Sequence, residues 1–181
     1  MRIIAGKWKG KKLVAPPGED TRPTSDRARQ ALFDMLWHAP WAGRECVDGA
    51  IVLDAFAGTG TLGLEALSRG AAKAAFIEKD RAALVALRAN IANCGAEAQV
   101  IAGDANKPPR PMQPATLVFL DPPYGAGLLG PALEALDKAG WLAPGALICT
   151  ELDTKDPIPE TRFETLDDRR HGKARLLILR G

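Results

Sequence analysis

The 181-residue sequence has few cysteines and histidines and no long hydrophobic run. Its three cysteines, Cys46, Cys94 and Cys149, lie far apart and form no CxxC pair, so they indicate reduced packing residues and exclude a disulfide framework. Two histidines are too few for a histidine-rich site, and we therefore expect no metal. Charged residues and prolines interrupt every apolar run well short of a membrane span, so no membrane contact is expected.

The composition is that of an ordinary globular protein. Hydrophobic residues make up 46% and charged residues 25% of the chain, which excludes a mainly disordered protein. The length suits one domain that can bury a sizeable core. The first seven residues, MRIIAGK, lack the apolar segment of a signal peptide, and we expect a cytoplasmic protein. Nothing in the sequence indicates an obligate protein partner.

Basic residues gather at the start of the chain. The net charge is only +2, yet the first twelve positions hold five cations and no anion. Such a cluster suggests a surface that faces a polyanion, although a solvated tail would have the same composition. Alternation of lysines with Trp8 and Gly10 suits an extended ribbon with cations along one edge. The candidate contacts with a nucleic acid are Lys7, Lys9, Lys11, Lys12, Arg22, Arg27 and Arg29.

From about residue 50, short apolar segments alternate with helical patterns. The predicted strands are 51–53, 74–77, 99–102, 117–120 and 146–149, and the predicted helices are 61–69, 81–93 and 128–139. The proline-rich segment 107–111 is predicted to be a loop. This alternation indicates a parallel sheet covered by helices on both faces. Strands at 162–166 and 175–179 are predicted to close the sheet, one of them antiparallel to the rest.

A further helix is predicted before the sheet. It begins at Thr24 or Ser25, either of which can cap it, and apolar residues recur at helical spacing after that point. The helix should end near His38, because the residue before Pro40 is pushed out of the helical region.

A glycine-rich turn, Gly58-Thr59-Gly60-Thr61-Leu62-Gly63, follows the first predicted strand and opens a helix. With Glu78 at the end of the next strand, it matches the NAD-binding fingerprint, in which a helix N-terminus receives a pyrophosphate. A tight turn of small residues is the simpler alternative. Asp54 argues against NAD, because its carboxylate would repel a pyrophosphate in a partly desolvated crevice. It suits S-adenosylmethionine (SAM), which carries an ammonium and a sulfonium group, a carboxylate and a ribose.

Gly103-Asp104-Ala105 follows the third predicted strand. A carboxylate there could accept a hydrogen bond from the adenine amino group, although Gly-Asp after a strand is more often a turn. Like Asp54 and Glu78, Asp104 lies at the carboxyl end of a strand, where open α/β sheets bind their ligands.

Asp121-Pro122-Pro123-Tyr124 follows the fourth predicted strand. The prolines fix the backbone and remove two N–H donors, which leaves the Asp121 carboxylate and the Pro122 carbonyl as acceptors beside the Tyr124 ring. This set suits a planar base with an exocyclic amino group, whose hydrogens are accepted while the ring stacks. Two acceptors free the nitrogen lone pair for a methyl donor, so positioning and electrostatics supply most of the catalysis. A rigid turn with an incidental tyrosine is the alternative.

The order DAFAGTGTLG, IEKD, GDA and DPPY resembles the class I SAM-dependent methyltransferases that modify nucleobase amines. The N-terminal strings RIIAG, KWKGK and TRPTSDR resemble the RsmD family of bacterial ribosomal RNA (guanine-N2) methyltransferases, and the likeness covers nearly the whole chain. It implies a Rossmann-like α/β fold with a seven-stranded, mostly parallel sheet whose last strand is antiparallel. The expected division is a basic, RNA-facing extension and helix at residues 1–40, packed on a methyltransferase domain at residues 41–181.

The resemblance also implies an activity and a site. Methyl transfer from SAM to the N2 amine of a guanine in 16S ribosomal RNA would yield S-adenosyl-L-homocysteine, with free RNA or the small-subunit particle as partner. The implied cofactor-binding residues are Asp54, Gly58 and Gly60 at the methionine moiety, Glu78 at the ribose and Asp104 at the adenine, with Ala55, Lys79 and Ala105 beside them. Asp121, Pro122 and Tyr124 are the implied catalytic residues. Related proteins often have arginines where this chain has Lys7, Lys9 and Lys11, which lack the bidentate fork.

Three other functions compete with this one. DPPY also serves adenine and cytosine methylation in DNA, although no separate stretch here could form the sequence-reading domain that DNA enzymes usually add. A catalytically silent, RNA-binding ribosome assembly factor could share the fold, but intact Asp121, Tyr124 and glycine turn weigh against it. An NAD-dependent dehydrogenase is the weakest alternative because of Asp54.

Overall fold

The computed structural model describes residues 1–16, 26–123, 127–171 and 174–181. Its elements in chain order are η1 (Gly6–Trp8), α1 (Asp26–His38), η2 (Arg44–Cys46), β1 (Ile51–Ala55), α2 (Thr61–Ser68), β2 (Lys73–Glu78), α3 (Arg81–Cys94), β3 (Gln99–Ala102), β4 (Ala115–Leu120), α4 (Leu129–Ala139), β5 (Leu142–Asp153), β6 (Glu164–His171) and β7 (Ala174–Arg180). Each helix and strand predicted from the sequence pattern is present, with shifted ends and a longer β5. The predicted caps of α1, Thr24 and Ser25, lie outside the described residues.

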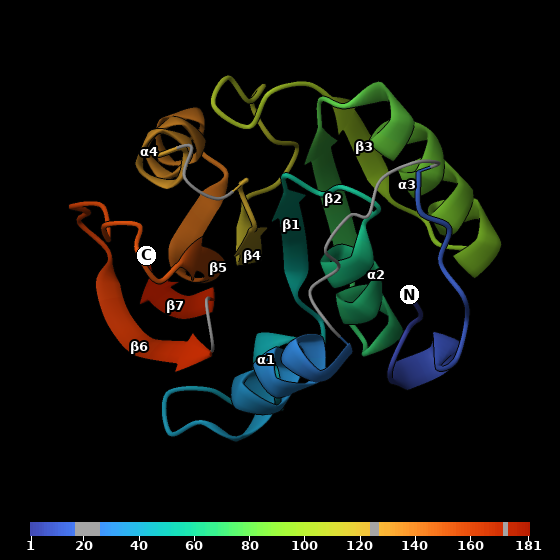
Figure 1. The fold of residues 1–181 in the computed structure, drawn as a ribbon, viewed down its shortest axis with the longest axis horizontal. Coiled ribbons are helices and arrows are strands. Elements are labelled where there is room, and N and C mark those ends of the chain that lie inside the picture. Colours follow the sequence, from blue (N-terminus) through green and yellow to red (C-terminus); the bar gives the residue numbers. More distant parts are fainter. Residues whose placement is uncertain (17–25, 124–126, 172–173) are drawn as a thin grey trace.

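The strands form one seven-stranded sheet in the order β3-β2-β1-β4-β5-β7-β6 (Figure 1). Strands β1 to β5 pair in parallel, and β7 runs antiparallel to both of its neighbours. The predicted mostly parallel sheet with an antiparallel last strand is therefore confirmed. Strand order reverses between β1 and β4, and such a switch point is where open α/β sheets bind ligands at the carboxyl ends of their strands.

Helices cover both faces of the sheet, as predicted. Alternate residues of each strand point to opposite faces, so Val52 joins the apolar cluster under α1, α2 and α3, whereas Leu53 joins the cluster under α4. Figure 1 shows α4 above the sheet and α1 below it. Phe33 of α1 lies 5.8 Å from Phe119 of β4, measured between ring centroids, so α1 shares the core of the sheet.

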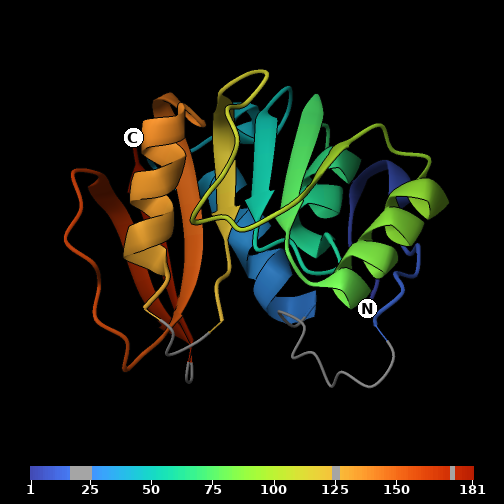
Figure 2. The same ribbon diagram turned by 90° about the horizontal axis from the view of Figure 1, so that it is seen from above.

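The α4 face is completed by the loop of residues 103–114, which crosses the sheet between β3 and β4 (Figure 2). The prediction that its prolines exclude a helix is confirmed. The buried Trp141 donates a hydrogen bond of 2.7 Å from Nε1 to the Pro109 carbonyl, which holds the loop against the start of β5. No helix within the described residues has the length and apolar character needed to cross a membrane.

The first 14 residues, termed here the N-terminal arm, fold back on themselves. Arg2 and Lys12 form an antiparallel bridge, and the Ile3 N–H donates to the Lys11 carbonyl at 2.9 Å. Ile3 and Leu13 are buried in the core, and η1 makes the turn between the two limbs. The predicted extended ribbon is therefore wrong, because burial of these two apolar side chains closes the arm into a short loop.

Candidate active site

The turn after β1 has an unusual backbone. Phe56 has a positive φ of 64°, which is uncommon for a residue other than glycine. Gly60 has a φ of 78°, and its N–H donates to the Ala57 carbonyl at 2.7 Å, so the chain reverses sharply before α2. A Cβ on Gly60 would lie 2.3 Å from Leu87 Cδ1, so both conformation and space require glycine there.

Gly63 lets α2 pack tightly against the sheet. A Cβ at this position would lie 2.4 Å from Phe76 Cε1. By contrast, a Cβ on Gly58 would meet nothing within 4 Å, so the space over the turn is open. The glycines thus divide into Gly60 and Gly63, which allow packing, and Gly58, which borders open space.

Asp54 is buried, and its carboxylate binds the backbone at the start of α2. Its Oδ2 accepts a hydrogen bond of 2.8 Å from the Gly63 N–H, in the first turn of the helix. Burial raises the pKa of Asp54 to about 8, and the charges of Asp121 and Glu78 add to the rise while the Gly63 N–H opposes it. The structure thus gives Asp54 a backbone partner at the start of α2.

Glu78 holds the glycine turn in place. Its Oε2 accepts from the Gly58 N–H at 2.7 Å, and its Oε1 accepts from the N–H groups of Lys79 at 2.8 Å and Asp80 at 2.7 Å. A carboxylate has about four acceptor positions, so one remains for a ligand hydroxyl after these contacts. Of the predicted cofactor residues, Glu78 therefore contacts both Gly58 and Lys79 directly.

Asp104 follows β3 in a turn closed by its own side chain. Its Oδ1 accepts from the Asn106 backbone N–H and from Asn106 Nδ2, both at 2.9 Å, and these bonds lower the pKa of Asp104. The Gly103 N–H donates to the Glu78 carbonyl at 2.9 Å, which places this turn beside the end of β2. Ala105 is buried in the apolar cluster under α4.

Asp121 lies at the same edge of the sheet. Ala55 of β1 pairs with Leu120 of β4, so the residues that follow these strands start side by side. The charge of Asp121 reaches Asp54, as the pKa of the latter shows. Pro122 is buried and Asp121 half-buried, whereas Tyr124 lies outside the described residues. The described residues contain no group of three or more His, Cys, Asp or Glu side chains that could hold a metal ion.

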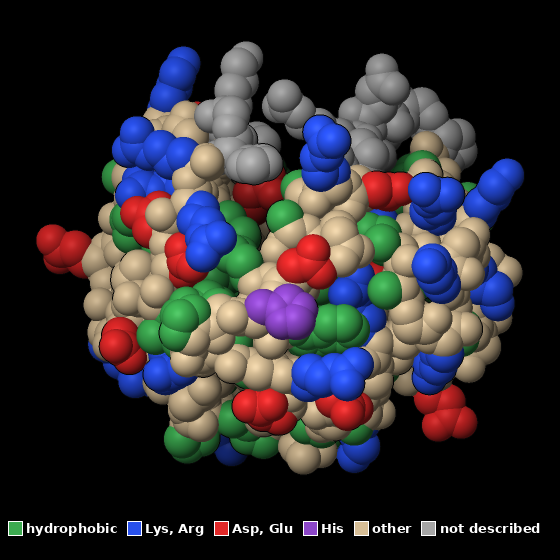
Figure 3. All heavy atoms as spheres, turned by 90° about the horizontal axis from the view of Figure 1, so that it is seen from below, with side chains coloured by type: hydrophobic (Ala, Val, Ile, Leu, Met, Phe, Trp, Pro, Cys, Tyr) green, Lys and Arg blue, Asp and Glu red, His purple; other side chains and the backbone are tan. Residues whose placement is uncertain are grey.

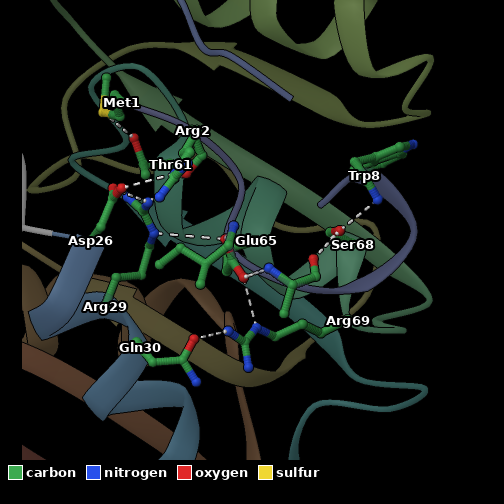
Figure 4. A network of polar contacts seen from close by, with 12 residues as sticks. Met1, Arg2, Trp8, Asp26, Arg29, Gln30, Thr61, Glu65, Ser68 and Arg69 are labelled. Carbon is green, nitrogen blue, oxygen red and sulfur yellow. Dashed lines mark hydrogen bonds and ion pairs between the residues drawn. The ribbon is translucent and has the colours of Figure 1, made fainter. Parts of the chain in front are cut away.

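A buried carboxylate on α2, Glu65, was missed by the sequence analysis (Figure 4). It accepts hydrogen bonds from the Ile4 N–H at 2.8 Å, the Ala5 N–H at 3.0 Å and Arg69 Nε at 2.7 Å. Glu65 therefore fixes the N-terminal arm to the helix that follows the glycine turn. A glutamate among the apolar residues of TLGLEALS was the available signal.

The structure corrects the prediction that Arg29 contacts RNA. Its side chain is fully buried, donates to the Arg2 carbonyl at 2.6 Å and to Asp26 Oδ1 at 2.9 Å, and lies 3.7 Å from Glu65. The Arg29 side chain points from α1 toward the protein interior. Its guanidinium lies between α1 and the arm, where no RNA phosphate can reach it. Burial lowers the pKa of Arg29, opposed mainly by Glu65.

The other predicted RNA contacts differ in exposure. Lys7, Lys9, Lys12 and Arg27 are exposed, and Figure 3 shows Lys and Arg side chains along the side of the molecule that carries the arm. Lys11 is half-buried, and its Nζ donates to the Asn93 carbonyl at the end of α3 at 2.5 Å. Arg22 lies outside the described residues.

Asn90 connects the arm to the glycine turn. It is fully buried on α3, and its Nδ2 donates to the carbonyls of Val14 and Thr59, both at 3.0 Å. Its Oδ1 accepts from the Val14 N–H at 2.7 Å. Met1 Sδ lies 3.1 Å from Thr61 Oγ1, which donates to it. The arm is thus held to the last part of the turn and to the first residue of α2.

The sheet is open, its strand order reverses between β1 and β4, and carboxylates gather at the edge where these strands end. These features define a Rossmann-like protein of the class I methyltransferase fold. Residues 1–180 match the family model described as Conserved hypothetical protein 95. The chain belongs to this family, the RsmD family.

Three known proteins illustrate the likeness. Ribosomal RNA small subunit methyltransferase D of Escherichia coli K12 is 43% identical over 161 residues, which cover 88% of this chain and 78% of that protein. The solved structure of the putative methyltransferase yhhF from Escherichia coli has a TM-score of 0.84 at 37% identity, with 99% of this chain and 97% of that chain covered. The RNA methyltransferase from Salinibacter ruber in complex with S-adenosyl-L-homocysteine has a TM-score of 0.65, with 87% and 92% of the two chains covered, but at 17% identity it shows the fold alone.

Proposed function

We propose that this protein transfers a methyl group from SAM to the exocyclic N2 amine of a guanine in 16S ribosomal RNA. The observation that supports the proposal is the pairing of β1 with β4, because it brings Asp121, the residue assigned here to the amine, to the same edge of the sheet as Asp54 and the glycine turn. Membership of the family and the name of its Escherichia coli relative, ribosomal RNA small subunit methyltransferase D, support ribosomal RNA as the substrate class.

The residues at this edge fit SAM. Gly58 borders open space, and the start of α2 offers backbone N–H groups and a positive dipole end for the methionine carboxylate. Glu78 retains one acceptor position for a ribose hydroxyl, and Asp104 retains its Oδ2 for the adenine amine. When bound, SAM supplies an electrophilic methyl group and leaves as S-adenosyl-L-homocysteine.

The residues after β4 hold the target base in this proposal. The Asp121 carboxylate and the Pro122 carbonyl accept the two amino hydrogens, and the Tyr124 ring stacks on the guanine. A base amine is a weak nucleophile because its lone pair is delocalised into the ring. Acceptors on both hydrogens counter that delocalisation, and the nitrogen loses a proton after the new N–C bond has formed.

RNA binding is assigned to the exposed cations of residues 1–40, with residues 41–181 as the methyltransferase domain. A single flipped base offers one ring to the site, so phosphate contacts must supply most of the affinity. The exposed Lys7, Lys9 and Lys12 are suited to this role, and Arg27 projects from α1. A ribosomal RNA substrate, free or in the small-subunit particle, would place the protein in the cytoplasm.

Transfer of labelled methyl from SAM to purified 16S RNA, 30S particles and duplex DNA tests the proposal. Nucleoside digestion should show the label in N2-methylguanosine from one of the RNA substrates and none in DNA. Label in adenine or cytosine of DNA would establish the competing DNA methyltransferase. RNA binding without any methyl transfer would indicate a catalytically silent assembly factor. Binding of NADH in a parallel calorimetric titration would favour the NAD-dependent dehydrogenase instead.

A further inference from the structure

The β6–β7 hairpin extends past the catalytic edge of the sheet. Strand β4 ends at Leu120, which pairs with Thr150, whereas β5 continues to Asp153, where it pairs with Ala174 at the start of β7. Three more residues at about 3.3 Å each carry the hairpin end roughly 10 Å beyond the end of β4. Two strand spacings of about 4.8 Å separate β7 from β4 sideways.

Three arginines lie at this end of the hairpin: Arg169, Arg170 and Arg175, termed here the basic hairpin end. Residues alternate between faces along a strand, so Arg170 and its cross-strand partner Arg175 share one face and Arg169 lies on the other. Figure 3 shows Lys and Arg side chains on both flanks of the molecule, one of them the arm side and the other the hairpin side.

Two of these arginines are held by carboxylates, and the third is not. Arg175 donates to both oxygens of Asp168 at 2.7 and 2.6 Å, and Arg169 Nε donates to both oxygens of Asp167 at 3.0 and 3.1 Å. Arg170 is exposed and, among the described residues, forms no ion pair. Within the described residues, the hairpin end therefore presents one exposed cation without an ion pair, near Asp168, beside two oriented guanidinium groups.

This arrangement does not favour stability. Arg170 and Arg175 stand directly opposite each other across the strand pair, and like charges in that position are destabilising. An exposed edge strand does need charge to prevent pairing with other chains, but either sign would serve that purpose. Asp168, on the same face two residues before Arg170, offsets part of this repulsion through its ion pair with Arg175. A phosphate beside the exposed Arg170 would offset the rest.

We propose that the basic hairpin end is a second phosphate-binding surface, which grips the RNA backbone on the side of the catalytic edge opposite the N-terminal arm. This inference rests on the proposed function, because the polyanion at this edge is the RNA that is methylated. Contacts on both sides would hold the strand across the edge, with the target base pointing toward Asp121. The planar guanidinium suits phosphate oxygens in pairs.

The test compares four full-length proteins: the parent, Arg170→Glu, Arg170→Lys and Lys138→Glu. Arg170→Glu keeps a charge on the edge strand, so an anti-aggregation role is preserved while a phosphate contact is reversed. Lys138→Glu is the matched control, with the same change of charge at the far end of α4, on an exposed side chain. KM and kcat for the ribosomal RNA substrate are measured over a range of salt, together with SAM binding by calorimetry.

Arg170→Glu should raise KM for RNA with little change in kcat, and the slope of log(kcat/KM) against log salt should become shallower by about 0.7–0.9 for each lost phosphate contact. Arg170→Lys should keep the parental slope, and Lys138→Glu should match the parent. SAM affinity should be the same in all four. If Arg170→Glu and Lys138→Glu have the same KM for RNA and the same salt slope, whether both differ from the parent or neither does, the inference is overturned. The proposed function is unaffected by that result as long as the parent methylates RNA. A parent that methylates no RNA overturns the proposed function itself.

Discussion

The carboxylate of Glu78, at the end of β2, accepts a hydrogen bond of 2.7 Å from the backbone N–H of Gly58, in the turn after β1. A residue expected to bind the cofactor ribose thus also shapes the loop that receives the methionine moiety. Loss of this side chain would remove a ligand contact and release the turn at the same time.

Glu78→Ala should therefore weaken SAM binding. A lost acceptor that leaves its partners unpaired costs roughly 1–3 kcal/mol, and the freed Gly58 N–H adds to that cost. Isothermal titration of the variant with SAM measures the effect. Glu97→Ala, at an exposed position after α3, is the matched control and should bind SAM as the parent does. Equal dissociation constants for the parent and Glu78→Ala would remove Glu78 from the cofactor site.

Asp121→Ala should abolish methyl transfer and leave SAM affinity within a few-fold of the parent. The carboxylate is assigned to the target amine, where charge develops in the transition state, so its loss should act on kcat more than on cofactor binding. Single-turnover transfer to ribosomal RNA, with SAM calorimetry alongside, separates the two effects. Near-parental turnover in this variant would show that Asp121 takes no part in the reaction.

Asp54 should make stability depend on pH. Its pKa is about 8 in the folded protein against an ordinary value of 3.8, so the folded state binds this proton more tightly than the unfolded chain. The resulting stability is complete below about pH 4 and is lost as the pH rises through about 8. Asp54→Asn keeps an acceptor for the Gly63 N–H and cannot ionise, so it should gain stability relative to the parent over that range.

Urea unfolding of the parent and Asp54→Asn at several pH values between about 5 and 8 checks this, because all other titrating groups are common to both proteins. The difference in unfolding free energy should grow with pH. A difference that stays constant would mean that Asp54 is ionised throughout.

Simultaneous replacement of Lys7, Lys9 and Lys12 by Ala should leave the fold and SAM binding intact and weaken RNA binding. These lysines are exposed, whereas Lys11 is retained because its Nζ binds the Asn93 carbonyl. The salt dependence of RNA binding should become shallower by about 0.7–0.9 per lost phosphate contact. Filter binding of 16S RNA over a range of salt gives the slope, with Lys138→Ala as the control. An unchanged slope and unchanged methylation would make the arm a solvated segment.

Glu65→Ala should destabilise the protein by about 3–5 kcal/mol, because it leaves the buried Arg69 guanidinium without its carboxylate and Arg29 with Asp26 alone. Denaturant unfolding measures the loss. Glu134→Ala, which removes an exposed partner of Lys138, should change stability little. If the two variants unfold at the same denaturant concentration, the Glu65 network contributes nothing to the fold.

Much of the fold follows from local patterns in the sequence. Apolar segments such as Gln99–Ala102 match the observed β3, because a short apolar run between turn residues has few other uses in a sheet protein. The glycine turn was placed correctly, since Gly60 is needed for a positive φ and Gly63 for close packing. Acidic residues at successive strand ends were expected to meet, because parallel strands end at one edge of a sheet.

Burial and long-range partners could not be predicted in the same way. Arg29 was assigned to RNA as one of the basic residues that gather at the start of the chain, yet Glu65, 36 positions later in the sequence, draws the side chain inward. The lysine-rich arm was expected to be extended, but burial of Ile3 and Leu13 closes it. Helices, strands and turns are encoded in neighbouring residues, whereas the direction of a charged side chain depends on which distant carboxylates and apolar surfaces the packed sheet brings beside it.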